Sequence, residues 1–133
     1  MGKYGDTAVR ATELLRKATL TPECAWETSA REVFPNSPSS QVKGCPRGAF
    51  LGLYYSGRLR GISPSTQGAA HLGANARYAV EAVSLLTKNP ELATGSKAAL
   101  WSRVMLVTGS DATKKPNGQM DVVVSLWQRK LVG

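Results

Sequence analysis

Hydrophobic side chains recur along most of the chain at the spacing of an α-helix that buries one face. The first such stripe, which starts at Tyr4 and ends at Ala18, predicts a helix over about residues 4–18. Similar stripes predict helices over about residues 22–34, 45–57, 72–88, 96–107 and 119–131. We therefore expect an all-α protein in which residues 1–133 form a single compact domain of five to six helices.

Local signals predict several helix ends. Thr21, which a proline follows, is typical of a helix N-cap, and Ser96 is a candidate cap of the same kind. The helix after Ser96 is expected to bury Leu100, Val104 and Val107 and to end at Gly109. Ser65 or Thr66 is the expected cap of the helix that contains the stripe from Leu72 to Leu86. Between the last two predicted helices, residues 110–118 hold no apolar side chain larger than alanine, so we expect a mobile connector there.

The segment Ser39–Ile62, SSQVKGCPRGAFLGLYYSGRLRGI, has the most unusual backbone chemistry. Cys45 is the expected N-cap of its helix because a proline follows it, and Gly57 is expected to end that helix. Gly48 and Gly52 would leave one helix face almost bare, at a cost of about 1 kcal/mol each relative to alanine. We expect another helix or a second subunit to pack closely on this face, and in the latter case the protein is a homodimerising scaffold.

Two shorter patterns occur in this helix and directly after it. Basic and apolar residues alternate in Arg58-Leu59-Arg60, which predicts a short extended segment near residues 58–62. Residues 50–55 can be laid over residues 123–128 without gaps, and both stretches place an aromatic residue after a leucine. A duplicated helical unit would produce this match, and so would two amphipathic helices by chance.

Positive charge is concentrated in one part of the chain. The net charge is +8, and no acidic residue occurs between Glu32 and Glu81. A region of one sign attracts phosphates or an acidic protein partner, so nucleic acid or another polyanion is the expected ligand. The alternative is that the net charge serves only solubility. The acid-free region contributes five candidate contacts to a polyanion: Lys43, Arg47, Arg58, Arg60 and Arg77.

A helix ending at Gly57 and followed by a basic arm resembles the recognition helix and wing of winged-helix proteins. In that reading the five cations contact phosphates and contribute affinity without reading the base sequence. The helix itself is apolar and rich in glycine, which suits packing better than contact with base edges.

The two cysteines, Cys24 and Cys45, are expected to be free thiols in a reducing cytoplasm, because no hydrophobic signal core begins the chain. Cys45 is a candidate reactive thiol, since a helix N-terminus, Lys43 and Arg47 would stabilise its thiolate. The alternative is a capping or buried structural cysteine, and Cys24 is expected on the buried side of its helix.

Other chemistry finds little support in the sequence. Ser40 and Lys43 fit a Ser-x-x-Lys spacing, but the companion motifs of that enzyme class are absent. The single histidine, His71, and two distant cysteines predict no metal site, and no nucleotide-binding glycine pattern occurs. Asp121 is explained by the dipole of its own helix. We identify no catalytic set, expect no cofactor, and expect no membrane-spanning segment.

Four stretches of the sequence resemble a family of small bacterial proteins of about 130 residues that is classed as a domain of unknown function. They are GKYGDTAVRA at the start, SSQVKGCPRGAFLGL in the middle, the helix with Tyr78-Ala79-Val80 and Ala82-Val83, and GQMDVVVSLW near the end. The resemblance implies no activity, substrate or cofactor. This chain departs from the family at residues 68–73, where related sequences are richer in charge.

Three classes of function therefore remain open. The first is a basic binding protein for nucleic acid or another polyanion. The second is a small-ligand binder or enzyme with Cys45 at its pocket. The third is a helical scaffold that dimerises through the Gly48 and Gly52 face.

Overall fold

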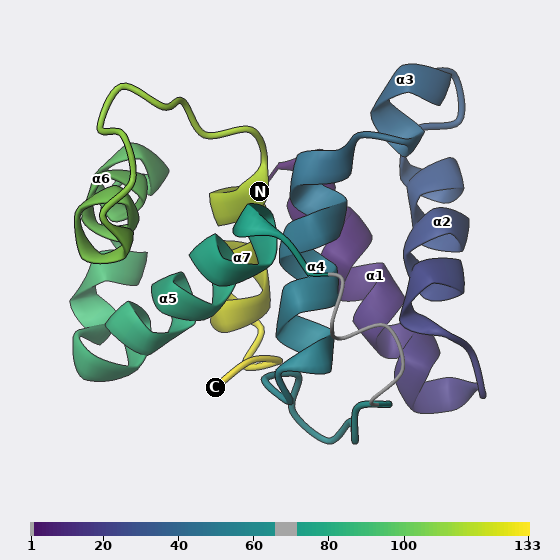
Figure 1. Cartoon of the computed structure of the whole chain (residues 1–133). Helices are drawn as coiled ribbons and strands as arrows, with labels where there is room; N and C mark the ends of the chain where they lie inside the picture. Colours follow the sequence, from purple (N-terminus) through teal and green to yellow (C-terminus); the bar gives the residue numbers. More distant parts are fainter. Residues whose placement is uncertain (1, 66–71) are drawn as a thin grey trace.

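The computed structural model describes residues 2–65 and 72–133. The expected all-α fold is confirmed, and the described residues contain no strand. Six helices have 10 to 15 residues, and the two short elements, α3 and the 3₁₀ helix η2, have four each. In chain order the elements are α1 (Lys3–Lys17), α2 (Pro22–Val33), α3 (Pro38–Gln41), α4 (Gly44–Tyr55), α5 (Ala74–Lys88), η2 (Pro90–Ala93), α6 (Lys97–Thr108) and α7 (Gln119–Gln128) (Figure 1).

Most of the predicted helix ends are confirmed. The Thr21 side chain accepts a hydrogen bond from the Cys24 backbone nitrogen at 3.1 Å, and Ser96 caps α6 in the same way. The start of α5 at Ala74 agrees with the predicted helix over about residues 72–88, but the predicted cap is wrong: the N-cap is Gly73, whereas Ser65 lies well before the helix and Thr66 lies outside the described residues. The first turn of α5 packs against α4, and this tertiary contact, not a side-chain cap, fixes where the helix begins.

The two halves of the chain each contain three longer helices in corresponding order, although the short elements α3 and η2 lie at different places in that order. Helices α1, α2 and α4 correspond to α5, α6 and α7, and α2 and α6 each bury one tryptophan, Trp26 and Trp101. The similarity of residues 50–55 to residues 123–128 therefore belongs to a repeat of a three-helix unit. Helices α1 and α5 share identical residues at these aligned positions: Ala8 and Ala79, Val9 and Val80, Ala11 and Ala82, Leu14 and Leu85, Leu15 and Leu86, Lys17 and Lys88.

Helices α4 and α7 lie side by side at the centre of the molecule and run in the same direction (Figure 1). Their amino ends meet where a Cβ atom on Gly118 would lie 3.2 Å from Cβ of Pro46. Their carboxyl ends meet where Leu59 and Val132 form an isolated antiparallel β-bridge. Leu59 and Val132 occupy equivalent positions in the two halves, so an approximate two-fold axis passes between α4 and α7.

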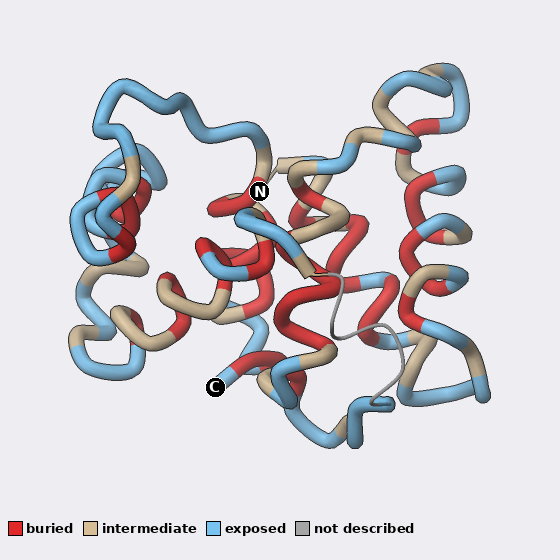
Figure 2. The backbone as a smooth tube through the Cα atoms, in the orientation of Figure 1, coloured by how far each residue is buried: buried red, intermediate tan, exposed pale blue. Residues whose placement is uncertain are grey.

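The other helices are placed around this central pair. Helix α1 packs on α7 as α5 packs on α4, while α2 and α6 lie on the outside (Figure 1). Figure 2 shows that the buried residues run through the centre of the fold along α4 and α7. Phe50, Leu53, Val123 and Leu126 are completely buried there, and one continuous apolar cluster joins all six longer helices. Because α4 is a core helix, it cannot enter a nucleic-acid groove as a recognition helix would.

The predicted close packing of Gly48 and Gly52 is confirmed, and the partner is α5. A Cβ atom on Gly52 would lie 2.5 Å from Cβ of Ala76, and one on Gly48 would lie 3.1 Å from Cβ of Asn75. The bare face therefore serves contact within the chain. Because α5 covers this face, it is not free to pair with a second copy.

The extended segment predicted near residues 58–62 contains one end of the β-bridge. The backbone nitrogen of Arg60 donates to the carbonyl oxygen of Leu131 at 2.9 Å, and that of Gly133 donates to Arg58 at 3.2 Å. Each side of the bridge follows a helix that ends in a left-handed residue, Gly57 after α4 and Lys130 after α7. Lys130 adopts φ 59°, a conformation that favours glycine.

Three expectations about side chains were wrong or need refinement. Val107 was expected on the buried face of α6 but is 52 % exposed, because that helix packs inward mainly through Leu100, Trp101, Val104 and Met105. Cys24 was expected to be buried and is exposed. The connector at 110–118, which was expected to be mobile, is held by several contacts: the indole nitrogen of Trp101 donates to the carbonyl oxygen of Lys114 at 2.8 Å, and Nζ of Lys114 donates to the Tyr78 hydroxyl at 3.0 Å.

Within the described part of the chain, no helix has the length and apolar character needed to cross a membrane.

Candidate anion-binding groove

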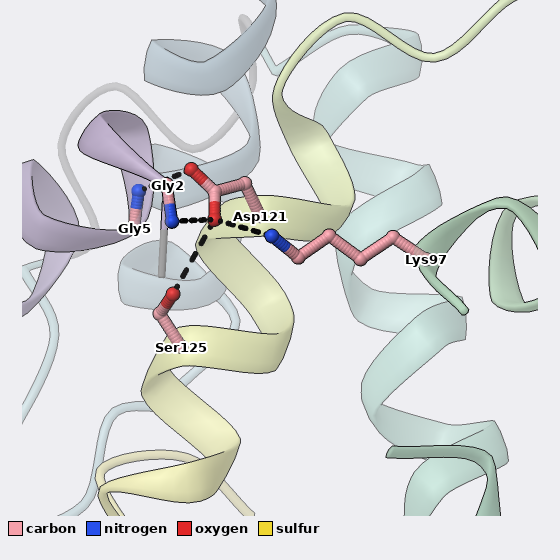
Figure 3. A network of polar contacts seen from close by, with 5 residues as sticks. All are labelled: Gly2, Gly5, Lys97, Asp121 and Ser125. Atoms are coloured by element: carbon pink, nitrogen blue, oxygen red, sulfur yellow. Dashed lines mark hydrogen bonds and ion pairs between the residues drawn. The ribbon is translucent and has the colours of Figure 1, made fainter. Parts of the chain in front are cut away.

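A network of polar contacts surrounds Asp121 in the first turn of α7 (Figure 3). Its carboxylate accepts hydrogen bonds from the backbone nitrogens of Gly2 at 3.1 Å and Gly5 at 2.8 Å, and it pairs with Nζ of Lys97 at 3.0 Å. The hydroxyl of Ser125 lies 3.5 Å from the same carboxylate. Asp121 therefore supplies acceptors to the amino end of α1 as well as a charge beside its own helix dipole.

The expectation was that the carboxylate of Asp121 interacts only with the dipole of its own helix. The network shows that it also binds the amino end of α1 and Lys97. Sequence reasoning missed the link because Gly2 and Gly5 are far from Asp121 along the chain. A signal was present, since GKYGD and GQMD both belong to the stretches that resemble the family. The carboxylate already fills the anion-binding position at the amino end of α1, so we look for a ligand site elsewhere.

The five basic residues predicted to contact a polyanion are not brought to one face. Lys43 and Arg47 lie at the amino end of α4, where Nζ of Lys43 is 5.8 Å from the centre of the Tyr4 ring and Arg47 is 3.8 Å from a carboxylate oxygen of Glu27. Arg77 donates to the carbonyl oxygen of Thr108 at the end of α6, at 2.9 Å. These three cations are therefore engaged within the protein.

Arg58 and Arg60 lie beyond the other end of α4, about 18 Å away for a helix of this length. The carboxyl ends of α1, α4 and α7 meet there, since Arg16 of α1 donates to the carbonyl oxygen of Arg60, and Arg60 donates to Leu131. Three parallel helices present about 1.5 negative charges at their carboxyl ends. Four cations are placed at these ends, so a net positive charge remains: Arg16, Arg58, Arg60 and Lys130.

A groove of about 590 Å³ opens at this end of the molecule, between η2 and the carboxyl end of α7. Arg60 and Lys130 line it together with Trp127, Ala93, Thr94 and Val132. Its lining contains no carboxylate, although Glu91 lies on the same short helix as Ala93. Arg60 comes from the acid-free region and Lys130 from the end of the chain, so only the fold brings the two charges to one groove.

Trp127 differs from the other two tryptophans. Trp26 and Trp101 are 1 % and 4 % exposed, whereas Trp127 is only partly buried and lines the groove. The Trp101 indole nitrogen has a hydrogen-bond acceptor, and none of the hydrogen bonds among the described residues involves the Trp127 indole. Likewise, the three ion pairs of the described residues include neither Arg60 nor Lys130. These groups can therefore contact a ligand without breaking an internal ion pair.

The predicted thiol site receives less support. Cys45 lies in the first turn of α4, whose N-cap is Lys43, so it is not itself the cap. Its sulfur is half-buried at 3.9 Å from Nδ2 of Asn117 and does not line the groove. Neither cysteine is in a disulfide.

The remaining chemical candidates are also placed by the structure. Ser40 accepts a hydrogen bond from Ser37 at 2.7 Å, while the ammonium of Lys43 lies over Tyr4, so the Ser-x-x-Lys pair is not assembled. His71 lies outside the described residues. Among residues 2–65 and 72–133, histidine, cysteine and acidic side chains form no group of three that could hold a metal ion.

Two tyrosines have shifted pKa values outside the groove. Burial and a hydrogen bond to Glu23, at 2.7 Å, raise the pKa of Tyr55 to about 12. The pKa of Tyr78 is lowered from its ordinary value, mainly because Lys114 donates to its hydroxyl at 3.0 Å and Ser110 also bonds to it. Both interactions join neighbouring elements, which assigns them a structural role.

Comparison with known proteins gives one match. No curated protein and no solved structure matches the chain. A family model described as a family of unknown function (DUF6979) matches residues 1–133. With the stretches that resemble such a family now placed along the core helices and around Asp121, the chain belongs to this family of unknown function.

Proposed function

We propose that the protein is a binding protein for a polyanionic partner, either a nucleic acid or an acidic protein segment, and that the partner binds in the groove beside Trp127. The observation that carries the proposal is the pair of cations, Arg60 and Lys130, which flank an accessible indole in a groove without a carboxylate. Aromatic rings and cations in one groove can bind an anionic chain by stacking and charge together. Both cysteines are free, which supports action in a reducing compartment such as the cytoplasm.

The structure changes which cations we assign to this function. Lys43, Arg47 and Arg77 have partners within the protein, and Arg60 remains from the acid-free region together with Arg58 beside it. Lys130 joins them from outside that region. The alternative of a pocket at Cys45 has no comparable observation behind it.

The proposal can be tested first without knowing the partner. Because Trp26 and Trp101 are buried, quenching of the intrinsic fluorescence by small ions reports mainly on Trp127. Iodide should quench it more strongly than caesium, because the cations of the groove attract the anion. The double variant Arg60→Gln with Lys130→Gln should remove this preference, while Arg103→Gln with Lys115→Gln, two exposed cations elsewhere, should leave it unchanged.

A binding experiment completes the test. Fluorescein-labelled poly-glutamate and a labelled 20-nucleotide single strand are titrated with the protein at low and at moderate salt. At least one of them should bind, more weakly at higher salt and more weakly still to the groove double variant. Absence of binding to both at low salt would refute the proposed function.

A further inference from the structure

The groove beside Trp127 has a counterpart in the first half of the chain. Trp127 and Tyr54 hold equivalent positions in the aligned stretches 123–128 and 50–55, and the loop after α5 corresponds to the loop after α1. The hollow beside Tyr54 is lined by that loop, at Ala18, Thr19 and Leu20, as the groove beside Trp127 is lined by Pro90, Ala93 and Thr94. The approximate two-fold axis therefore relates the two sites.

The first-half site is covered by a non-helical piece of the chain itself, residues 61–65. Gly61, Ile62 and Ser63 line the hollow, and Ile62 packs against the apolar core. The backbone nitrogen of Ser65 donates to the hydroxyl of Tyr54 at 3.0 Å. With this segment in place Tyr54 is only 7 % exposed.

The second-half site differs in two ways. Trp127 is more exposed than Tyr54, and the groove over it is open. Its rim carries Arg60 and Lys130, whereas Gly57 is the residue equivalent to Lys130 in the first half. The lining of the second site thus holds two cations, Arg60 and Lys130, whereas that of the first holds one, Arg16.

We propose that the groove binds a short, extended, acidic peptide segment of a partner protein, which lies over Trp127 as residues 61–65 lie over Tyr54. This inference rests on the proposed function and specifies the partner. Arg60 can bind a carboxylate with two parallel hydrogen bonds, and Lys130 supplies a second charge. Trp127 and Ala93, both only partly buried, offer an apolar surface for one aliphatic side chain, the role that Ile62 has in the first half.

A peptide fits these observations better than a nucleic acid does. A nucleic acid strand could also stack a base on the indole. The occupant of the equivalent site is a polypeptide, however, held by an aliphatic side chain and a backbone nitrogen. Charge complementarity then selects acidic sequences from among extended peptides.

The test is a selection from a display library of random 12-residue peptides on the immobilised full-length protein. We expect enrichment of peptides that combine two or more acidic residues with an aliphatic one. Synthetic copies of the enriched peptides should quench the Trp127 fluorescence on binding. Their affinity should fall about tenfold or more in Arg60→Gln with Lys130→Gln, and also in Trp127→Ala, while Arg103→Gln with Lys115→Gln should bind as the parent does.

The outcomes separate this inference from the proposed function. The labelled 20-nucleotide single strand is measured beside the peptides under the same conditions. Binding of the strand without enrichment of acidic peptides would overturn the peptide inference and retain the polyanion function, and binding of neither would overturn both. Peptides that bind the groove variants as tightly as the parent would also overturn the inference. Thermal melting confirms that each variant is folded, and the double variant changes only exposed side chains, so its folding should be unaffected.

Discussion

The backbone nitrogen of Gly5 lies 2.8 Å from Oδ2 of Asp121, although 116 positions separate the two residues along the chain. This contact joins the first helix to the last and places Gly5 against Ser125, where an added Cβ atom would lie 2.6 Å from the Cβ of that serine. The same contact recurs in the other half between Ala76 and Gly52, which are the equivalents of Gly5 and Ser125. Two close crossings of small residues therefore hold α1 against α7 and α5 against α4.

We expect Asp121→Asn to destabilise the protein by about 1 to 3 kcal/mol, because the substitution leaves the amino end of α1 and Lys97 without their charged acceptor. Urea unfolding followed by circular dichroism measures the change. Asp111→Asn is the matched control, since Asp111 is exposed and bonds only within its own turn, to Thr113. Equal stability of the two variants would contradict the assigned role of the network.

The glycines of α4 should respond to alanine in a graded way. Gly52→Ala should destabilise by about 1 to 3 kcal/mol, because its Cβ atom would overlap Ala76 of α5. Gly48→Ala should cost less, since Asn75 lies 3.1 Å from the added atom and its side chain can shift. Gly44→Ala meets nothing within 4 Å and should be neutral or stabilising. Ala76→Gly should not rescue Gly52→Ala, because backbone atoms of Ala76 remain in the way. Melting temperatures for the series provide the comparison, and a reversed order would refute the close crossing.

Replacing Lys130 with glycine should separate stability from binding. Its left-handed backbone, φ 59°, costs a side-chain-bearing residue about 1 kcal/mol relative to glycine. Lys130→Gly should therefore raise the free energy of unfolding while it weakens polyanion binding at the groove. Lys130→Gln, which keeps a side chain, should weaken binding without raising stability. A loss of stability in the glycine variant would show that the lysine side chain contributes more to the fold than its conformation costs.

The tyrosine titration should spread over a wide pH range. Absorbance at 295 nm should show Tyr78 ionising below the ordinary tyrosine range and Tyr55 ionising with a pKa of about 12. Since the folded-state pKa of Tyr55 is raised, its contribution to stability is complete below pH 10 and is lost as the pH rises from about 10 to about 12. For Tyr78 the folded-state pKa is lowered, so its contribution is present above the ordinary pKa and is lost as the pH falls through the folded value.

Variants identify the two phases of this titration. Tyr55→Phe should remove the ionisation with a pKa of about 12. Tyr78→Phe should remove the ionisation that occurs below the ordinary tyrosine range. A titration in which both phases survive in both variants would contradict the hydrogen bonds to Glu23 and Lys114.

The two thiols should differ in their rate of alkylation at neutral pH. Cys24 is exposed on α2, whereas Cys45 is half-buried beside Asn117, so Cys24 should react first. Mass spectrometry of the protein after brief treatment with iodoacetamide locates the label. Faster modification of Cys45 would revive the hypothesis of a reactive thiol at the start of α4.

Helical periodicity, cap residues and helix-ending glycines depend on neighbours within a few positions, which is why the sequence alone could predict the all-α class and most helix bounds. Thr21, Ser96 and Gly109 act through bonds to residues at most four positions away, and such signals are readable without the fold. The close packing on the face of Gly48 and Gly52 could be predicted for the same reason, because two missing side chains on one helix face require a close neighbour. That this neighbour is α5 could not be predicted from the sequence.

What only the tertiary structure decided is where distant segments meet. The partners of Asp121 and the exposure of Val107 depend on contacts with other helices, and no local pattern encodes them. Four of the five basic residues of the acid-free region are divided between the two ends of α4, Lys43 and Arg47 at its amino end and Arg58 and Arg60 beyond its carboxyl end, while Arg77 lies on α5. Arg60 and Lys130 are 70 positions apart and share a groove, because the two-fold arrangement of α4 and α7 pairs Leu59 with Val132 beside them.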